Sequence, residues 1–393
     1  MTKLYLIRHA EAEGNLYRRI HGQYDSLLTV NGYRQIDALK NRFADVHIDA
    51  AYSSDLFRAR TTLQLAICDP KGLPLHTRAD LREISVGEWE DETWGEMDFL
   101  HHDEMMEFTQ TSPQFKAKNG ESFEEVRQRV SKALLEIASA HPDQTVAVCS
   151  HGTAMRNTLA LFKGLSVSET RTMGHSDNTA VSLLEIDNGK VNIVFADDNS
   201  HLPDSISTLQ RQGWWKNKSG ASPDENLWYT PLDIAQPLHK GLYLAARHEA
   251  WTDLGRDPQV FNPQWYLEGA QNCIHAGPRF LLCAQRKTTI VGLLQMDPEQ
   301  NKEENAGYIS FFYMLPEHRN RGLGVQMLGQ AVSTYRPMGR DKLHLSCAND
   351  NPGANRFYEK FGFCKKETWE TPFGTDMNLM EKYIGYDLLG VHS

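Results

Sequence analysis

The sequence predicts an α/β protein of two or three domains, with a mostly parallel sheet in its first half. The length of 393 residues is too great for one ordinary hydrophobic core. Residues 3–7 and 145–149 form short apolar runs, each followed by a polar segment that contains histidine, as is typical of buried parallel strands. Between these runs apolar residues recur at helical spacing, as expected of helices that cover a sheet.

The ends of the apolar runs carry the first group of candidate functional residues. Arg8 and His9 follow the first run, and His151 follows the second. A third, weaker run at residues 51–54 precedes a helical pattern with Arg58 in its first turn. Ligands of open α/β sheets collect beyond the carboxyl ends of the strands, so we expect these four side chains to converge. Their arrangement predicts a cationic cluster suited to a phosphoryl group.

Two further segments of the first half are predicted to be helical. Thr29 is expected to cap a helix over residues 30–43, whose apolar face includes Val30 and Tyr33. Residues 94–118 are rich in Met, Phe, His and acidic residues, without a long clean period. We interpret this segment as a helical lid over the site.

The end of the first half carries two strong local signals. Ser122 and Glu125 have the spacing of a capping box, which predicts a long helix from residue 123 onward. The dipeptide Asn188-Gly189 lies between two apolar runs and favours the type I′ turn of a β-hairpin. We therefore expect the first domain to end on a hairpin.

A change of composition marks the boundary between the halves. Residues 203–226 are rich in Ser, Gly, Lys and Asn around Trp214 and Trp215. We predict a first domain at 1–203, a linker at 204–226 and a second domain at 227–393. The second domain is expected to open with a strand at 227–230, followed by a helical stretch.

The second half contains its own candidate site. An aromatic and β-branched run at 308–315 reads as a strand, and the segment Arg319-Asn320-Arg321-Gly322-Leu323-Gly324 then opens a helix. Glycines at such a turn let backbone amides approach a ligand, and the helix N-terminus adds partial positive charge. The segment therefore predicts an anion cradle that suits a pyrophosphate.

The first half resembles the histidine phosphatases of the phosphoglycerate mutase superfamily. The resemblance lies in Leu6-Ile7-Arg8-His9-Ala10-Glu11, Asn15, Gly22 with Asp25, Leu28-Thr29 with Gly32 and Gln35, Ser53-Ser54-Asp55-Leu56 with Arg58 and Ala59, Leu81-Arg82-Glu83 with Gly87, Gly120-Glu121-Ser122, and Ser150-His151-Gly152. Two positions depart from it: Ala10 and Asp91 stand where the family often has Gly.

This resemblance implies a three-layer α/β/α fold and a metal-independent phosphomonoesterase. His9 would be the nucleophile and form a phosphohistidine, and Glu83 would be the general acid and base. Arg8, Arg58 and His151 would neutralise the phosphoryl oxygens. The residues implied to bind phosphate or substrate are Arg8, Asn15, Gly22, Arg58, Glu83, His151 and Gly152. No carboxylate cluster for a metal is evident in the sequence.

A phosphoglycerate mutase is the alternative within this superfamily. Cofactor-dependent mutases carry Arg, Tyr and Gly shortly after the acid Glu, whereas residues 84–89 here read Ile-Ser-Val-Gly-Glu-Trp. This difference favours hydrolysis.

The second half, over about residues 227–385, resembles the GNAT acetyltransferase superfamily. The resemblance lies in Arg319-x-x-Gly322-x-Gly324, in Asn351-Pro352-Gly353-Ala354 and in the aromatic segment 357–363. It implies an α+β GNAT fold that uses acetyl-CoA to acetylate the amine of a small molecule. Tyr358 would protonate the departing thiolate. The residues implied to bind the cofactor are Met314, Leu315, Arg319, Asn320, Arg321, Gly322, Leu323, Gly324, Asn351 and Tyr358.

The sequence of the second half identifies neither the catalytic base nor whether the domain is an enzyme. Residues 310–313 carry no carboxylate, so the base that deprotonates the amine is not identified. A domain that only binds acyl-CoA without turnover is the alternative reading.

Net charge, the length of apolar runs and cysteine spacing limit the kinds of partner and location that we expect. The formal net charge of −10 argues against a nucleic-acid surface. No apolar run approaches the roughly 18 residues of a membrane span. The six cysteines form no CxxC pair, which favours reduced thiols and a cytoplasmic location. The expected partners are a small phosphate ester and a small amine, and nothing indicates the oligomeric state.

Overall fold

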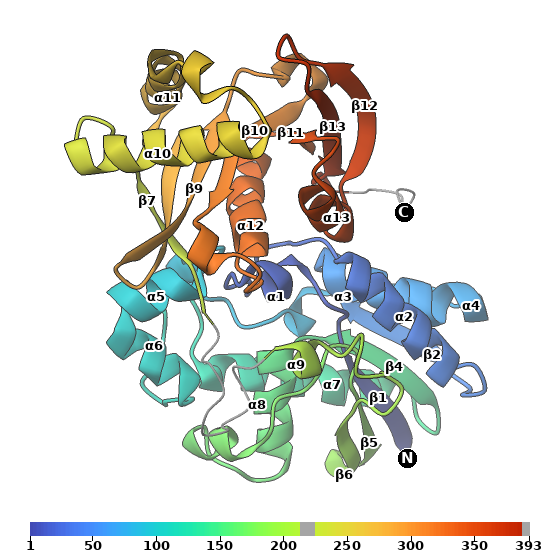
Figure 1. Cartoon of the computed structure of the whole chain (residues 1–393). Helices are drawn as coiled ribbons and strands as arrows, with labels where there is room; N and C mark the ends of the chain where they lie inside the picture. The colour runs from blue at the N-terminus through green and yellow to red at the C-terminus, as the bar shows by residue number, and fades with distance from the viewer. Residues whose placement is uncertain (213–224, 387–393) are drawn as a thin grey trace. The chain divides into compact units, whose positions relative to one another are not determined.

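The computed structural model describes residues 1–212 and 225–386, which fold into two compact units (Figure 1). The units are Met1–Asp224 and Glu225–Ser393. We call them the first and the second domain and describe each by itself.

The first domain is built on a six-stranded sheet of order β3-β2-β4-β1-β5-β6. Its strands are β1 (Thr2–Arg8), β2 (Ala50–Ser54), β3 (Leu75–Arg78), β4 (Thr145–Ser150), β5 (Val181–Asp187) and β6 (Lys190–Asp198). Its helices are α1 (Glu13–Tyr17), α2 (Val30–Arg42), α3 (Phe57–Leu63), α4 (Asp69–Lys71), α5 (Trp94–Leu100), α6 (His102–Thr109), α7 (Phe123–Ala140), α8 (Gly152–Phe162) and α9 (Thr208–Arg211). The first four strands of the sheet order are parallel, and β5 and β6 are antiparallel.

Alternating side chains of the central strands face two helical layers. On one face, Leu6 and Val148 pack in one core with residues of α7 and α8. On the other face, Ile7 and Cys149 pack with residues of α2 and α3. Successive side chains of a strand point to opposite faces, so both faces of a central strand can be buried. The three-layer α/β/α fold is thereby confirmed.

The local signals at the helix and turn positions are confirmed. Ser122 Oγ accepts from the Glu125 amide at 3.2 Å while Glu125 Oε2 accepts from the Ser122 amide at 2.7 Å, which completes the capping box of α7. Asn188 and Gly189 have φ of 48° and 77°, as a type I′ hairpin turn requires.

The prediction for the buried face of α2 is wrong at its start. Val30 and Tyr33 are 47% and 39% exposed, whereas Gln35 is fully buried. The Gln35 side chain accepts from the Glu11 amide at 2.7 Å and donates to the Ile206 carbonyl at 2.8 Å, so the start of α2 turns a hydrogen-bonded polar side chain inward.

Part of the expected linker belongs to the first domain. Residues 208–211 form α9, and this segment is held by two buried carboxylates. Ser207 Oγ donates to Asp177 at 2.5 Å, and Thr208 Oγ1 donates to Glu11 at 2.9 Å. The first domain therefore extends beyond residue 203. Trp214 and Trp215 lie outside the described residues.

The second domain contains a seven-stranded sheet of order β12-β13-β11-β10-β9-β8-β7. Its strands are β7 (Trp228–Pro231), β8 (Leu281–Arg286), β9 (Thr289–Asp297), β10 (Ala306–Met314), β11 (Lys342–Ala348), β12 (Cys364–Glu370) and β13 (Asp376–Tyr383). Its helices are α10 (Pro237–Asp253), α11 (Pro263–Ala276), α12 (Gly324–Tyr335) and α13 (Pro352–Lys360).

The two central strands of this sheet, β10 and β11, are paired over only part of their length. Among the described strands of this sheet, β10 and β11 are the one parallel pair, and they pair only from Ala306–Lys342 to Ile309–Leu345. Both strands continue beyond that point without pairing to each other. The first β10 residue past the paired part is Ser310, and from there on the two strands form no hydrogen-bonded ladder with each other.

The helices lie on both faces of the second sheet. Tyr243 of α10 and Ala270 of α11 pack in one core with Leu293 and Phe311. On the opposite face, a Cβ at Gly292 would lie 3.2 Å from Met327 of α12. Within the two described ranges, no helix is both long and apolar enough to cross a membrane.

Candidate active sites

The four cationic side chains predicted from the first domain come from neighbouring parallel strands. β2, β4 and β1 are adjacent in the sheet, so their carboxyl ends meet at one edge. The ring centroids of His9 and His151 are 5.1 Å apart. A Cβ at Gly152, the residue after His151, would lie 3.1 Å from Arg8 Nε, and the charges of Arg8 and Arg58 both lower the pKa of each histidine.

His9 is held in one tautomer. Its Nδ1 lies 2.7 Å from the Ala10 carbonyl oxygen. A carbonyl only accepts, so Nδ1 carries the proton and Nε2 of the neutral ring keeps its lone pair. Burial, followed by the charges of Arg58 and Arg8, lowers the pKa of His9 well below its ordinary value of 6.5. His9 is therefore neutral at pH 7 and can attack through Nε2.

Among the described residues, neither of the two arginines forms an ion pair with a carboxylate. Arg58 is 2% exposed and donates to the carbonyl oxygens of Tyr24, at 2.8 Å, and Gly22, at 2.6 Å. Arg8 donates to the carbonyl of Ser176, and its Nε finds no acceptor among the described residues. Carbonyl oxygens satisfy the N–H groups without neutralising the charge, so the pair suits a phosphate dianion.

His151 lies at the start of α8 and is fully buried. In the described part of the chain, neither of its ring nitrogens has a hydrogen-bond partner. Burial lowers its pKa well below 6.5, and the charge of Arg58 adds to that effect. Buried polar atoms are rarely left unpaired, and an oxygen of a bound phosphate would accept from the ring nitrogen that carries the proton.

The Glu83 carboxylate is held by the first turn of α8. Its Oε1 accepts from the amides of Ala154, at 2.7 Å, and Ile84, at 3.0 Å, and its Oε2 accepts from Thr153 at 2.9 Å. Thr153 follows His151 by two residues, so the carboxylate and the imidazole are tied to the same helix end. A phosphate bound at His151 would therefore lie near Glu83, which is the position required of a group that protonates the leaving oxygen.

Asn15 and Gly22 have structural contacts that explain their identity. Asn15 Oδ1 accepts from the Ala12 amide at 3.1 Å and so begins α1. A Cβ at Gly22 would lie 2.3 Å from the Ile84 carbonyl oxygen. Their contribution to substrate binding stays a prediction.

The departure at Asp91 is compensated locally. Asp91 adopts φ of 64°, a conformation in which Gly is favoured and Asp is tolerated. Its Oδ1 accepts from Arg19 Nε at 2.8 Å and lies 2.9 Å from His21 Nε2. The contacts of the Asp91 carboxylate thus help to hold the backbone in a conformation that favours glycine.

Sequence reasoning missed the segment Ser176, Asp177 and Asn178. Asn178 Nδ2 donates to the His9 carbonyl at 2.9 Å, the Ser176 carbonyl accepts from Arg8, and Asp177 binds Ser207. No period or spacing signals such a loop. The sequence indicates this loop only through the polar residues 175–179, which precede β5.

The predicted anion cradle of the second domain is present as a backbone feature. Asn320 and Gly322 have φ of 61° and 76°, which turns the chain tightly before α12. Within the described residues, none of the amides from Asn320 to Gly324 donates to a protein acceptor. Five free amides at a helix N-terminus suit a diphosphate.

The neighbouring predicted cofactor residues are partly engaged elsewhere. The Leu315 amide donates to the Val291 carbonyl at 2.9 Å, so it is not free for a cofactor. Arg319 donates to the Met314 carbonyl at 2.9 Å and to Glu249 at 2.6 Å. The Asn351 side chain accepts from the Ala354 amide at 3.0 Å and caps α13.

Glu249 is a carboxylate that sequence reasoning missed at β10. It comes from α10, and its Oε2 accepts from the Tyr313 hydroxyl at 2.7 Å. Hydrogen bonding to Tyr313 and the charge of Arg319 lower its pKa, which makes it a weak base.

Tyr358 of α13 is 7% exposed, and its ring centroid is 6.0 Å from that of Phe312 on the separated part of β10. Burial raises its pKa, so the phenol stays protonated. Among the described residues its hydroxyl has no hydrogen-bond partner, which leaves the proton available to a ligand.

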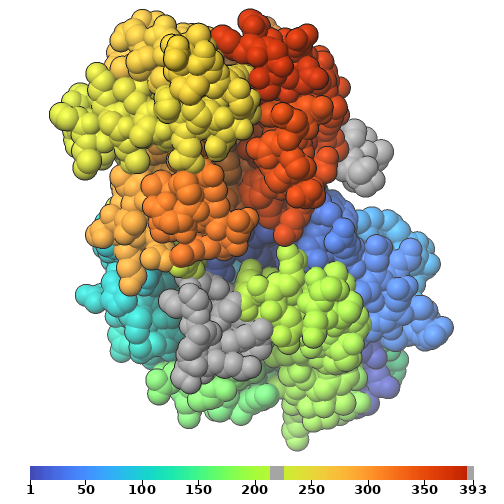
Figure 2. All heavy atoms as spheres, in the orientation of Figure 1, coloured from blue at the N-terminus to red at the C-terminus, as the bar shows by residue number. Residues whose placement is uncertain are grey.

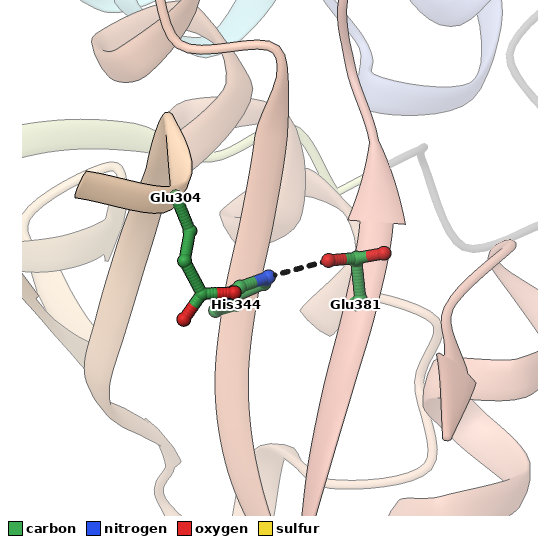
Figure 3. Close-up of side chains that lie close together, drawn as sticks. All are labelled: Glu304, His344 and Glu381. Carbon is green, nitrogen blue, oxygen red and sulfur yellow. Dashed lines mark hydrogen bonds and ion pairs between the residues drawn. The ribbon is translucent and has the colours of Figure 1, made fainter. Parts of the chain in front are cut away.

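A third group of polar side chains has the composition of a metal site. Ligand atoms of Glu304, His344 and Glu381 all lie within 4.8 Å of one another (Figure 3). The Lys366 ammonium lies 2.8 Å from Glu381 and 3.2 Å from Glu304, and His344 is bonded to Glu381 at 2.7 Å and to Asn301 at 2.8 Å. The Lys366 ammonium already balances the charge of the two carboxylates, and both ring nitrogens of His344 are hydrogen-bonded. We therefore describe this group as a hydrogen-bonded network.

Comparison with known proteins yields two separate matches. Residues 4–199 match the family model of the Histidine phosphatase superfamily (branch 1), and residues 243–363 match that of the Acetyltransferase (GNAT) family. Phosphoserine phosphatase 1 of Hydrogenobacter thermophilus is 30% identical over 202 residues, which are 51% of this chain and 95% of that protein.

Two further proteins match the same half. The metal-independent phosphoserine phosphatase of Arabidopsis thaliana is 31% identical over 217 residues, covering 54% of this chain and 87% of that protein. The solved structure of YhfR from Bacillus stearothermophilus is 30% identical, with a TM-score of 0.50, over 51% of this chain and 99% of that one.

Proposed function

Because the chain belongs to the histidine phosphatase superfamily and also carries a GNAT acetyltransferase domain, we propose that it is a bifunctional enzyme. The first domain would hydrolyse a small phosphate monoester through a phosphohistidine, and the second would acetylate a small amine with acetyl-CoA. The observation that carries the first half is the neutral, Nδ1-protonated His9 beside the charged side chains of Arg58 and Arg8.

The proposed phosphatase mechanism has two steps. His9 Nε2 attacks phosphorus, and the bond to the ester oxygen breaks as Glu83 gives that oxygen a proton. Glu83 then takes a proton from water, whose oxygen attacks the phosphohistidine and releases phosphate. Arg8, Arg58 and His151 stabilise the charge on the phosphoryl oxygens in both steps. The protein supplies this positive charge itself, so we expect no metal requirement.

Phosphoserine is the first substrate to test, since two of the similar proteins bear the name phosphoserine phosphatase. A mutase would instead interconvert phosphoglycerates. Residues 84–89 support hydrolysis, because they lack the Arg, Tyr and Gly of the mutases.

Trapping the phosphohistidine tests this proposal. The full chain is mixed with phosphoserine, quenched in alkali and digested, and we expect a mass increase of one phosphoryl group on the peptide that contains His9. His9→Ala should abolish it, while His47→Ala is the control, since the His47 side chain is 83% exposed. Activity should survive EDTA. A phosphoryl group on another residue, or transfer between phosphoglycerates without release, contradicts the proposal.

In the second domain, the free amides from Asn320 to Gly324 would hold the diphosphate of coenzyme A. Acetyl-CoA, when bound, supplies the acetyl group as a thioester. Tyr358 Oη would provide the proton that the leaving sulfur takes up. A domain that only binds acyl-CoA remains the alternative, and release of free thiol with an amine present separates the two.

A further inference from the structure

Every nitrogen of the Arg319 guanidinium faces an oxygen of the protein. Nε donates to the Met314 carbonyl at 2.9 Å, and one terminal nitrogen donates to Glu249 Oε1 at 2.6 Å. The other terminal nitrogen lies 3.9 Å from Asp253 Oδ2. A diphosphate that bound to this side chain would have to displace carboxylates from it. The side chain is thus already committed within the protein, although the sequence predicts that Arg319 binds the cofactor.

Glu249 of α10 connects this arginine to the central strand β10. Its Oε1 accepts from Arg319, and its Oε2 accepts from the Tyr313 hydroxyl at 2.7 Å. Tyr313 is 8% exposed and packs in the core that α10 shares with the sheet. The guanidinium carbon of Arg319 lies 5.4 Å from the centroid of the Tyr313 ring. Both oxygens of the Glu249 carboxylate are therefore used to join a helix, a strand and the segment that follows the strand.

Arg319 directly precedes the residues of the anion cradle. Within the described residues, none of the amides from Asn320 to Gly324 donates to the protein. A segment with so few hydrogen bonds of its own depends on its two ends for its shape. Its C-terminal end continues into α12, and its N-terminal end is held by the Arg319 side chain. The contact of Arg321 with Glu225, inside the segment, is longer at 3.6 Å.

The contact between Glu249 and Arg319 lies at the surface of the second domain. The two side chains are 35% and 38% exposed, and Figure 2 shows yellow α10 beside the orange part of that domain. An ion pair exposed to this extent contributes little to the stability of a whole fold. It still affects binding, because a loop that is not held in its bound shape must be ordered by the ligand, which weakens the affinity.

We propose that Glu249 and Arg319 form a positioning pair, which holds the amides from Asn320 to Gly324 in place for the diphosphate of coenzyme A. Arg319 acts through Glu249 and does not itself contact the cofactor. This inference rests on the proposed acetyltransferase function, because that function supplies the ligand.

Calorimetric binding of coenzyme A to the full chain distinguishes a positioning role from direct contact. Glu249→Ala and Arg319→Ala should each weaken binding by about 3- to 10-fold, the scale of a half-exposed charged hydrogen bond. The double variant should be no weaker than either single variant, because both changes remove the same interaction. If Arg319 instead contacted the diphosphate, Glu249→Ala would free the guanidinium, and binding would stay equal or become tighter.

The matched control is Glu299→Ala. Glu299 lies between β9 and β10, pairs with Lys302 at 3.2 Å and has a side chain that is 74% exposed. Its loss should leave the affinity for coenzyme A unchanged. Alanine is favourable in a helix, so Glu249→Ala should preserve α10, and the melting temperatures of all variants verify that each is folded.

A second readout needs no ligand. Trypsin cleaves after arginine, so the rate of cleavage after Arg321 is followed by mass spectrometry in the absence of coenzyme A. Loss of the positioning pair should speed this cleavage at least about threefold in both single variants, because the segment opens more often. Glu299→Ala should be cleaved at the rate of the wild type.

The possible results separate this inference from the proposed function. A wild-type chain that binds no coenzyme A contradicts the acetyltransferase proposal, and the cleavage rates then still decide whether the pair holds the segment. Unchanged cleavage in both single variants, equal or tighter binding of coenzyme A in Glu249→Ala, or additive losses of affinity in the double variant would overturn the inference.

Discussion

Gly152 lies directly against the guanidinium of Arg8. A Cβ at position 152 would be 3.1 Å from Arg8 Nε and 3.2 Å from Arg8 Cζ. Few real Cβ contacts are this short, so a side chain at this position forces Arg8 to move. The glycine after His151 therefore permits the close approach of β1 and the start of α8 that assembles the site.

Gly152→Ala is expected to lower kcat/KM for phosphate ester hydrolysis by about 10- to 100-fold, because a shift of Arg8 misplaces the phosphoryl group. Thermal melting should change little. The control is Gly174→Ala, since a Cβ there meets nothing within 4 Å. Steady-state kinetics with phosphoserine measure the effect, and equal rates in both variants contradict the assigned role of Arg8.

Glu83→Gln should reduce hydrolysis of phosphoserine by about 10²- to 10⁴-fold, as for loss of a general acid. Formation of the phosphohistidine from p-nitrophenyl phosphate should suffer less, because that leaving group departs without a proton. Rapid-quench kinetics separate the two steps. Glu88→Gln is the matched control, since Glu88 is exposed in the same segment and pairs with Lys118. Equal losses for both substrates would argue for a purely structural Glu83.

Tyr358→Phe is expected to lower acetyl transfer by about 10²-fold, because it removes the proton donor while keeping the ring. Calorimetric affinity for coenzyme A should stay nearly constant, because the amides from Asn320 to Gly324 are untouched. Tyr386→Phe is the control, because Tyr386 is 41% exposed. Unchanged turnover in the Tyr358 variant would show that water or another group protonates the thiolate.

The contacts of α9 predict where the first domain ends. Ser207→Ala and Thr208→Val each leave a buried carboxylate short of one donor, which should cost about 1–3 kcal/mol of unfolding free energy. Ser205→Ala is the exposed control. A chain cut after Gln212 should keep phosphatase activity, whereas one cut after Pro203 should be unstable. Equal stability of the two truncated chains in denaturant titration contradicts this boundary.

His201 predicts a loss of stability in acid. Its Nδ1 accepts from Arg42 at 3.1 Å, and burial followed by the charge of Arg42 lowers its pKa to about 4. Between pH 6.5 and about 4 the unfolded chain binds a proton that the folded one refuses, so stability falls as the pH falls through this window.

His201→Gln should flatten that pH dependence by at most about 1.4 kcal/mol per pH unit, and by less to the extent that solvent reaches the ring. Urea titrations at several pH values measure it. The exposed His47→Gln is the control. If the wild type is equally stable at pH 7 and pH 4.5, the assignment of a neutral His201 is wrong.

Local sequence determined much of this protein. The capping box of Ser122 and Glu125 and the turn at Asn188-Gly189 involve neighbours along the chain, and their hydrogen bonds form wherever the tertiary fold leaves them. The convergence of His9, His151 and Arg58 also followed from sequence, because parallel strands bring their carboxyl ends to one edge.

Only the tertiary structure decided the features that depend on distant partners. Ser207 donates to Asp177, and the Leu315 amide donates to the Val291 carbonyl. The identity of a polar residue such as Ser or Thr does not reveal whether its side chain is exposed in a linker or buried and hydrogen-bonded. Whether such a group is paired depends on the path of the whole chain, since its partner is recorded at no fixed spacing in the sequence.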